Sequence, residues 1–141
     1  MSASAAAALS FNRTAALTES AVRKANAARL TSSIEKSAGL RAIGLSEGAS
    51  PGYLRLPFRA PGSFDSLKSE GDPVRLGVSP SYPVALADLP ALQSSIAQRS
   101  DTPGARELAR TLVTAPTHSF LSERDLEGIE KLLSGVAKRR G

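Results

Sequence analysis

The chain has 141 residues, the size of one ordinary domain, and its hydrophobic content of 41% is enough for a modest core. It has no cysteine and one histidine, which excludes disulfides, thiolate chemistry and cysteine metal sites and leaves little basis for a zinc site. The net charge of +5 and the pI of about 10.1 admit nucleic acid as a partner, but the basic residues are spread out, and their only run is Lys138-Arg139-Arg140.

No apolar run approaches the roughly 20 residues that a membrane-spanning helix needs, and we expect a cytoplasmic protein without a membrane partner. Residues 1–18 are rich in Ala and Ser, and we expect a flexible segment there, followed by one domain over residues 19–141. An organelle transit peptide is the alternative for the opening, because it carries Arg but is poor in acids.

Hydrophobic periodicity predicts alternating helices and strands. In chain order they are a helix over 19–38, a strand over 53–58, a short helix that begins at 61–63, a strand over 74–79, a helix over 102–110, a strand over 111–115 and a helix that begins after Ser122. Residues 80–92 are rich in proline, and we expect no regular structure there. Three short strands, each followed by a helix, predict an α/β (α+β) layer: a small three-stranded sheet with helices packed on it.

Two local signals mark helix starts. Thr102 followed by Pro103 is typical of an N-cap and first turn. Ser122 with Asp125 three residues later is typical of a capping box. The apolar residues of the last helix fall on one stripe, which we expect to face the core: Leu126, Ile129, Leu132, Leu133 and Val136.

The unique histidine raises the possibility of a Ser-His-acid triad. His118 lies near Ser119, Ser122, Glu123 and Asp125 in the sequence. Such triads are defined by geometry, no Gly-x-Ser-x-Gly elbow is present, and Ser122 is already explained as a cap. We therefore interpret His118 as a turn residue between a strand and a helix.

Two further polar features have structural explanations. The acids that open the last helix complement its positive N-terminus, and we interpret them as a solvated face: Glu123, Asp125, Glu127 and Glu130. Asn26 falls in the middle of the first predicted helix, where Asn is slightly unfavourable, which favours a specific contact for its side chain.

Five segments occur in an order and spacing that is similar to one enzyme family. They are RKANAARL (23–30), GYLRLPF (52–58), RLGVSPSYPVAL (75–86), PGARELARTLVTAPTH (103–118) and LSERDLEGIEKLL (121–133). Together they resemble the C-terminal part of the DegT/DnrJ/EryC1/StrS aminotransferases, over roughly residues 20–137. The turn departs from the family's Leu-Pro-Thr-His-Pro pattern at Ala115 and Ser119.

The resemblance implies a pyridoxal-phosphate-dependent transaminase acting on nucleotide-linked sugars, of which this chain looks like the small domain. The family's Schiff-base Lys lies in a large domain, and none of the five lysines here has its sequence context: Lys24, Lys36, Lys68, Lys131 and Lys138. We therefore expect a truncated or split protein or a remnant that is inactive alone and binds no pyridoxal phosphate by itself. Its partner would be a large cofactor-binding domain on another chain, or a second copy of itself.

The resemblance also selects substrate-facing residues. The family's loop after the Gly-Val strand approaches the mouth of the active site, which here corresponds to Ser81, Tyr82 and Pro83. Tyr82 offers a hydroxyl and a stacking face to a sugar, and packing within the small domain is the alternative. Arg55 is a candidate for an anion, and His118 for a ligand contact. We assign no catalytic, cofactor-binding or metal-binding residue.

Two other classes of function stay open. One is a non-enzymatic basic α/β interaction domain that binds an acidic partner. The other is a nucleic-acid binder, which only the pI favours. An exposed apolar surface on the sheet would favour the aminotransferase-like domain, because the missing large domain would cover it.

Overall fold

The computed structural model describes residues 2–92 and 101–136 and has the expected mixture of helices and a sheet, with four strands where we expected three. The four α-helices are α1 (Ala3–Lys36), α2 (Asp65–Lys68), α3 (Pro103–Thr111) and α4 (Glu123–Gly135). Two short 3-10 helices, η1 (Leu86–Asp88) and η2 (Pro90–Leu92), precede α3. The basic run Lys138-Arg139-Arg140 lies outside the described residues.

The sheet is antiparallel with strand order β1-β2-β4-β3. Its strands are β1 (Arg41–Ala42), β2 (Arg55–Arg59), β3 (Ser79–Pro80) and β4 (Leu112–Pro116). The central pair, β2 and β4, is in register from Arg55 opposite Pro116 to Arg59 opposite Leu112. Both strands were predicted to within two residues. The two-residue strand β1 was not, because its length is too short to show a period.

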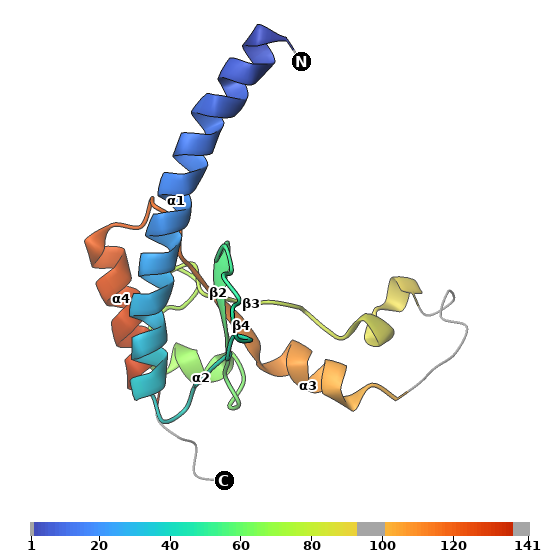
Figure 1. Ribbon diagram of the computed structural model, residues 1–141. Helices are drawn as coiled ribbons and strands as arrows, with labels where there is room; N and C mark the ends of the chain where they lie inside the picture. Colours follow the sequence, from blue (N-terminus) through green and yellow to red (C-terminus); the bar gives the residue numbers. More distant parts are fainter. Residues whose placement is uncertain (1, 93–100, 137–141) are drawn as a thin grey trace.

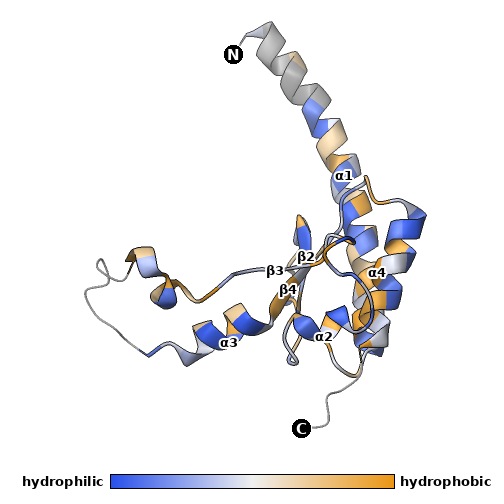
Figure 2. Cartoon of the chain, turned by 180° about the vertical axis from the view of Figure 1, so that it is seen from behind, coloured by the Kyte–Doolittle hydropathy of each residue, from blue (hydrophilic) through white to orange (hydrophobic). Residues whose placement is uncertain are grey.

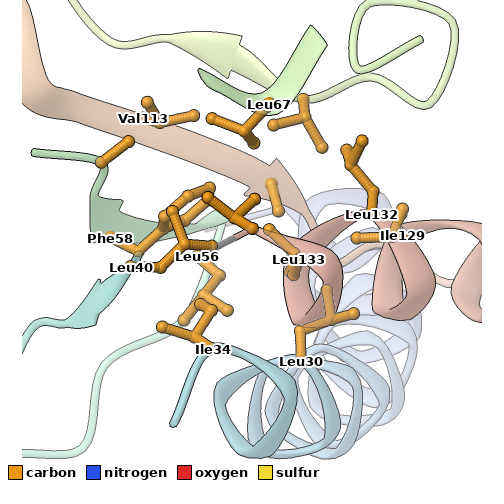
Figure 3. Close-up of a cluster of buried hydrophobic side chains, with 14 of the residues drawn as sticks. Leu30, Ile34, Leu40, Leu56, Phe58, Leu67, Val113, Ile129, Leu132 and Leu133 are labelled. Carbon is orange, nitrogen blue, oxygen red and sulfur yellow. The ribbon is translucent and has the colours of Figure 1, made fainter. Parts of the chain in front are cut away.

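One helical layer covers one face of this sheet (Figure 1). The C-terminal half of α1 lies beside α4, and both pack on the face of β2 and β4 that carries Leu56, Phe58 and Val113. Figure 3 shows the apolar side chains that meet between these layers, among them Leu30, Ile34, Ile129 and Leu133. The predicted stripe of α4 is buried, from Leu126 at 6% exposure to Leu133 at 0%.

α1 begins much earlier than expected. The pattern predicted a helix from Glu19, but the helix runs without a break from Ala3. The physical reason is composition, since Ala has the highest helix propensity of all residues and the opening segment is rich in it. The first half of α1 extends past the rest of the molecule, as Figure 1 shows. No helix in the described ranges combines the length and apolar character of a membrane span.

The predicted strand over 74–79 is wrong for most of its length. Residues 73–77 form a turn, and only Ser79–Pro80 pairs with β4. The turn is closed by Asp72, whose carboxylate accepts the Arg75 N–H at 3.0 Å, and by Gly77 at φ +72°. Val74 is consequently 68% exposed. The alternating apolar residues Val74, Leu76 and Val78 predict a strand, but a turn closed by Asp72 and Gly77 accommodates the same sequence.

The expected face of the 53–58 strand is correct for Leu56 and Phe58 and wrong for Leu54, which is 80% exposed. The alternation breaks because Tyr53 has a left-handed backbone with φ +46°. Thr102 is the N-cap residue of α3 and Pro103 lies in its first turn, as predicted, but the Thr102 side chain makes no capping hydrogen bond. The capping box at Ser122 and Asp125 is confirmed, with the Asp125 N–H to Ser122 Oγ distance at 3.2 Å.

Candidate functional site

The turn after β4 is tied to α1 and to the start of β2. Asn26 donates to the Thr117 carbonyl at 3.0 Å, which confirms that this mid-helix residue makes a specific contact. The buried Thr117 hydroxyl donates to the Tyr53 carbonyl. His118 follows directly. The turn is therefore fixed by two side chains whose hydroxyl and amide reach other elements.

His118 is part of this packed turn. Its ring lies 5.9 Å from the Phe120 ring, tilted by 50°, and its Nδ1 is buried without a hydrogen-bond partner. Asp125, the acid of the conceivable triad, accepts hydrogen bonds from Ser122, and these bonds lower its pKa. Ser122 and Asp125, one serine and one acid of that conceivable triad, are thus used by the helix cap.

A polar clamp beside His118 was not anticipated from the sequence. Glu19 on α1 pairs with Arg23 at 2.7 Å and accepts the Ser119 N–H at 3.4 Å. Hydrogen bonding from Ser119, and then the charge of Arg23, lower the pKa of Glu19. Arg23 also donates to the Leu54 carbonyl at 3.0 Å. The clamp holds the 118–120 turn against α1 and leaves Phe120 90% exposed.

Arg55 lies on the opposite face of the sheet from the helices. Its guanidinium donates to Thr114 Oγ1 at 2.7 Å, to the carbonyls of Gly77 and Thr114 and to Ser79 Oγ. Desolvation lowers its pKa. These partners are neutral, and Arg55 pairs with no acid among residues 2–92 and 101–136, so the residue links β2, β3 and β4 and remains able to meet an anion.

Tyr82 and the residues after it leave the sheet. The Ser81 N–H bonds to the Leu112 carbonyl at 3.0 Å, and the chain then runs away from the body beside α3, as Figure 1 shows. We refer to residues 81–92 together with α3 as the arm. A groove of about 400 Å³ lies between its two halves. Its lining is apolar apart from the Tyr82 hydroxyl: Tyr82, Pro83, Val84, Ala85, Leu86, Leu89, Ala105, Leu108 and Ala109.

One arginine joins the two halves of the arm. Arg106 on α3 donates to both carboxylate oxygens of Asp88, with the closest contact at 2.9 Å, and to Asp101 at 2.7 Å. The Arg106 hydrogen bonds lower the pKa of Asp88. Tyr82 is 56% exposed and Leu86 68% exposed. The arm therefore presents large apolar side chains to solvent, and Figure 2 shows hydrophobic stretches on it among hydrophilic ones.

The four candidate residues do not form one cluster. Arg55 contacts Ser79, two residues before Ser81, but its backbone pairs with Pro116, two residues before His118. Ser81 bonds to Leu112 at the other end of β4, and the strand from Leu112 to Pro116 spans roughly 14 Å at about 3.4 Å per residue. Ser81 and Tyr82 thus follow one end of β4 and His118 follows the other, while the Arg55 guanidinium contacts Thr114 in the middle of the strand.

Many arginines are occupied inside the domain. Arg29 on α1 binds Glu130 of α4 in a bidentate pair at 2.8 and 2.7 Å and Glu123 at 2.6 Å. Glu123 remains exposed, as its interpretation as a solvated acid requires, whereas Glu130 is half-buried in this pair, and Arg29 lowers the pKa of Glu130. Their partner lies 101 positions away from Glu130, so no local pattern contained the signal. Within 2–92 and 101–136, no group of three acids or histidines could hold a metal.

The fold is shared with aminotransferases. The chain matches DesV of S. venezuelae, solved with a ketimine intermediate, with a TM-score of 0.72 and 19% identity over 88% of this chain. A DegT DnrJ EryC1 StrS aminotransferase from Brucella abortus gives 0.64 at 20% identity, and the sugar aminotransferase CalS13 from Micromonospora echinospora gives 0.64 at 18%. No family model and no curated protein matches the chain.

The resemblance to the DegT/DnrJ/EryC1/StrS aminotransferases is thereby confirmed for the fold. The chain spans about a third of the length of these structures, 31% to 33%. Pyridoxal phosphate needs a Schiff-base Lys and a partner for its ring nitrogen. Lys24, Lys36, Lys68 and Lys131 do not line the arm groove, the depression beside Glu19 and Ser119, or the depression lined by Thr31 and Tyr53. These three depressions therefore do not offer the Lys that the cofactor requires.

Proposed function

We propose that this chain serves as the small domain of a sugar aminotransferase of the DegT/DnrJ/EryC1/StrS type. The observation that carries the proposal is the match of 88% of the chain, across its helices and its sheet, to one third of DesV. The matched structures are aminotransferases, and two of the proteins described above are a sugar aminotransferase and a complex with a ketimine intermediate. The large domain with the reactive Lys would be supplied from outside these 141 residues.

The surface of the sheet does not provide the interface that we expected. The face opposite the helices is mixed, because each polar residue on β2 and β4 pairs there with an apolar one: Arg55 with Pro116, Thr114 with Pro57 and Arg59 with Leu112. The apolar exposed surface lies on the arm instead. Contiguous apolar patches mark interaction sites, because leaving them in water is costly. The arm is therefore the surface that a large domain would cover.

Within such an assembly, Tyr82 would be the substrate-facing residue. Tyr82 lies near the start of the arm and its side chain is exposed. Its ring could therefore stack on a sugar while its hydroxyl donates or accepts a hydrogen bond. The Arg55 guanidinium reaches Ser79, two residues before Ser81, and a guanidinium suits the phosphates of a nucleotide-linked sugar. The role of this chain is to bind and orient substrate, and the cofactor chemistry belongs to the other domain.

The test is to co-express this chain with the product of the adjacent reading frame. If the proposal holds, that frame encodes a Lys-bearing pyridoxal-phosphate domain, the two chains purify together, and the complex shows internal-aldimine absorbance. An adjacent product that contains no such domain, or that does not bind this chain, contradicts the split arrangement.

Two substitutions test whether the arm is the interface with the large domain. Leu86→Asp on the arm should abolish co-purification, and Val74→Asp should not, because both side chains are 68% exposed but only Leu86 lines the arm groove. Equal effects of the two substitutions would rule out the arm as the interface. Tyr82→Phe should raise the KM for the sugar substrate without removing the aldimine absorbance.

A further inference from the structure

A second cavity lies on the other side of the molecule from the arm, beneath the loop that joins β1 to β2. Its volume is about 340 Å³, which is within the range of small-molecule sites. It is bounded by α1, by the loop and by the start of β2. The lining consists of Thr31, Ile34, Glu35, Ala42, Ile43, Gly44, Leu45, Tyr53, Leu56 and Pro57.

The loop over this cavity, residues 43–54, is held at both ends. At its start, β1 pairs with β2 through Ala42 and Phe58. Towards its end, Lys24 on α1 donates to Ser50 Oγ at 2.8 Å, and Arg23 donates to the Leu54 carbonyl at 3.0 Å. The loop therefore arches over α1 between fixed points, and the space below it is formed without a ligand.

Tyr53 is held in an unusual conformation at the edge of this cavity. Its φ of +46° is in the left-handed region, which costs an L-residue energy and persists only where the surroundings fix it. Here the buried Thr117 hydroxyl binds the Tyr53 carbonyl. Strained residues of this kind cluster at ligand sites. The tyrosine side chain is half-buried and contributes to the lining.

The cavity has one charged residue and an apolar floor. Glu35 is the only charged member of the lining, and it makes no salt bridge with any residue in the described ranges. Ile34 and Leu56, both nearly fully buried, form the floor, and Figure 3 shows them in the core between α1 and β2. The hydroxyls of Thr31 and Tyr53 add polar groups. No cationic side chain lines the space, which disfavours an anionic ligand.

We propose that this cavity binds a small organic cation that consists of an ammonium group on a short apolar or aromatic body. The ammonium would pair with the Glu35 carboxylate and lie near the face of Tyr53, where the ring attracts cations. The apolar body would rest on Ile34 and Leu56. This site is independent of the proposed aminotransferase role, since none of its residues belongs to the arm or contacts Arg55.

The test is to titrate phenethylammonium into the 141-residue chain and to measure binding by calorimetry and by amide chemical shifts. We expect saturable binding with shifts at the lining residues. Phenylethanol, the neutral analogue, and 3-phenylpropanoate, the anionic one, should bind much more weakly or not at all. Glu35→Gln should weaken the binding of phenethylammonium about five-fold, as expected for a partly solvated ion pair.

Glu47→Gln is the matched control. It removes one negative charge from the loop over the cavity, but Glu47 does not line the cavity, so affinity should be unchanged. Tyr53→Phe should keep most of the affinity and Tyr53→Leu should lose it, with far-ultraviolet circular dichroism as a check on folding. Should the leucine variant unfold, Glu35→Gln at its exposed helical position still decides the question.

The cation site is overturned by any of three results. They are equal binding of phenylethanol and phenethylammonium, equal effects of the substitutions at Glu35 and Glu47, and shifts confined to residues outside the cavity. Absence of saturable binding in the millimolar range also rejects it. None of these outcomes bears on co-purification with a large domain, so failure here and failure of the proposed function are distinguishable.

Discussion

Replacement of Thr117 by Val removes one hydroxyl from the point where the turn after β4, the start of β2 and α1 meet. Thr117 is fully buried, and its hydroxyl donates to the carbonyl of Tyr53. Valine has nearly the same shape, so the substitution leaves packing intact and leaves the Tyr53 carbonyl without its partner. The hydrogen bond from the Asn26 side-chain amide to the Thr117 carbonyl is unaffected.

The expected loss follows from the cost of an unsatisfied acceptor. A half-buried carbonyl without a hydrogen bond costs about 1–2 kcal/mol. Unfolding entropy near 2.1 cal/mol/K per residue gives about 0.3 kcal/mol/K for a chain of this length, so the midpoint should fall by about 3–7 °C. Hydrogen exchange at residues 51–54 should also accelerate, because the left-handed Tyr53 is no longer fixed from outside its own loop.

Thermal unfolding followed by circular dichroism measures the effect, with Thr111→Val as the control. Thr111 is equally buried, but its hydroxyl donates to the Glu107 carbonyl, which also accepts a helical N–H, and accepts from Arg59, whose part-exposed guanidinium can bind water instead. The control should therefore cost less. If Thr117→Val is no more destabilising than Thr111→Val, or leaves exchange at 51–54 unchanged, the hydroxyl does not hold Tyr53 and the reasoning is wrong.

Further predictions concern α4. Ser122→Ala removes the N-cap and should cost about 1 kcal/mol in chemical unfolding, and a threonine at this position should restore most of it. Because the pKa of Asp125 is lowered in the folded state, this residue contributes stability at pH values above its unfolded-state pKa, near 3.9. The contribution should disappear as the pH falls through the folded-state pKa. The Ser122→Ala variant, which lacks the hydroxyl that lowers this pKa, should therefore lose less stability in acid than the unchanged chain. Glu130→Gln should lower the thermal midpoint more than Glu127→Gln, because Glu130 pairs with Arg29 and Glu127 does not. Added salt should narrow the difference between the midpoints of the two variants.

Features that depend on contacts between residues close in the sequence could be predicted from the sequence. The capping box at Ser122 depends on residues three apart, and the buried stripe of α4 on a repeat of three to four, so both were predicted correctly. The strand over 74–79 failed because alternation cannot distinguish a strand from a turn that Asp72 and Gly77 close. In both cases the decisive atoms lie within a few residues, but only the cap has a distinctive residue pattern.

The candidate site was predictable only as separate pieces. The family resemblance indicated the role of Tyr82 after a Gly-Val segment, whereas only the structure showed that Tyr82 is exposed on the arm. The cavity beneath residues 43–54 had no counterpart in the sequence reading, because its walls come from α1, from an irregular loop and from β2. Tyr53 itself looked like an ordinary strand residue until its backbone conformation was known.

The sequence by itself determined the class of fold, the order of the main elements and the absence of cysteine chemistry, because these depend on composition and on periods shorter than one helical turn. Tertiary structure decided which charges are paired, which strand residues face the core and where a ligand could enter. Arg29 and Glu130 show the reason: they meet across 101 positions of the chain, and only the packing of α1 on α4 brings them within 2.7 Å.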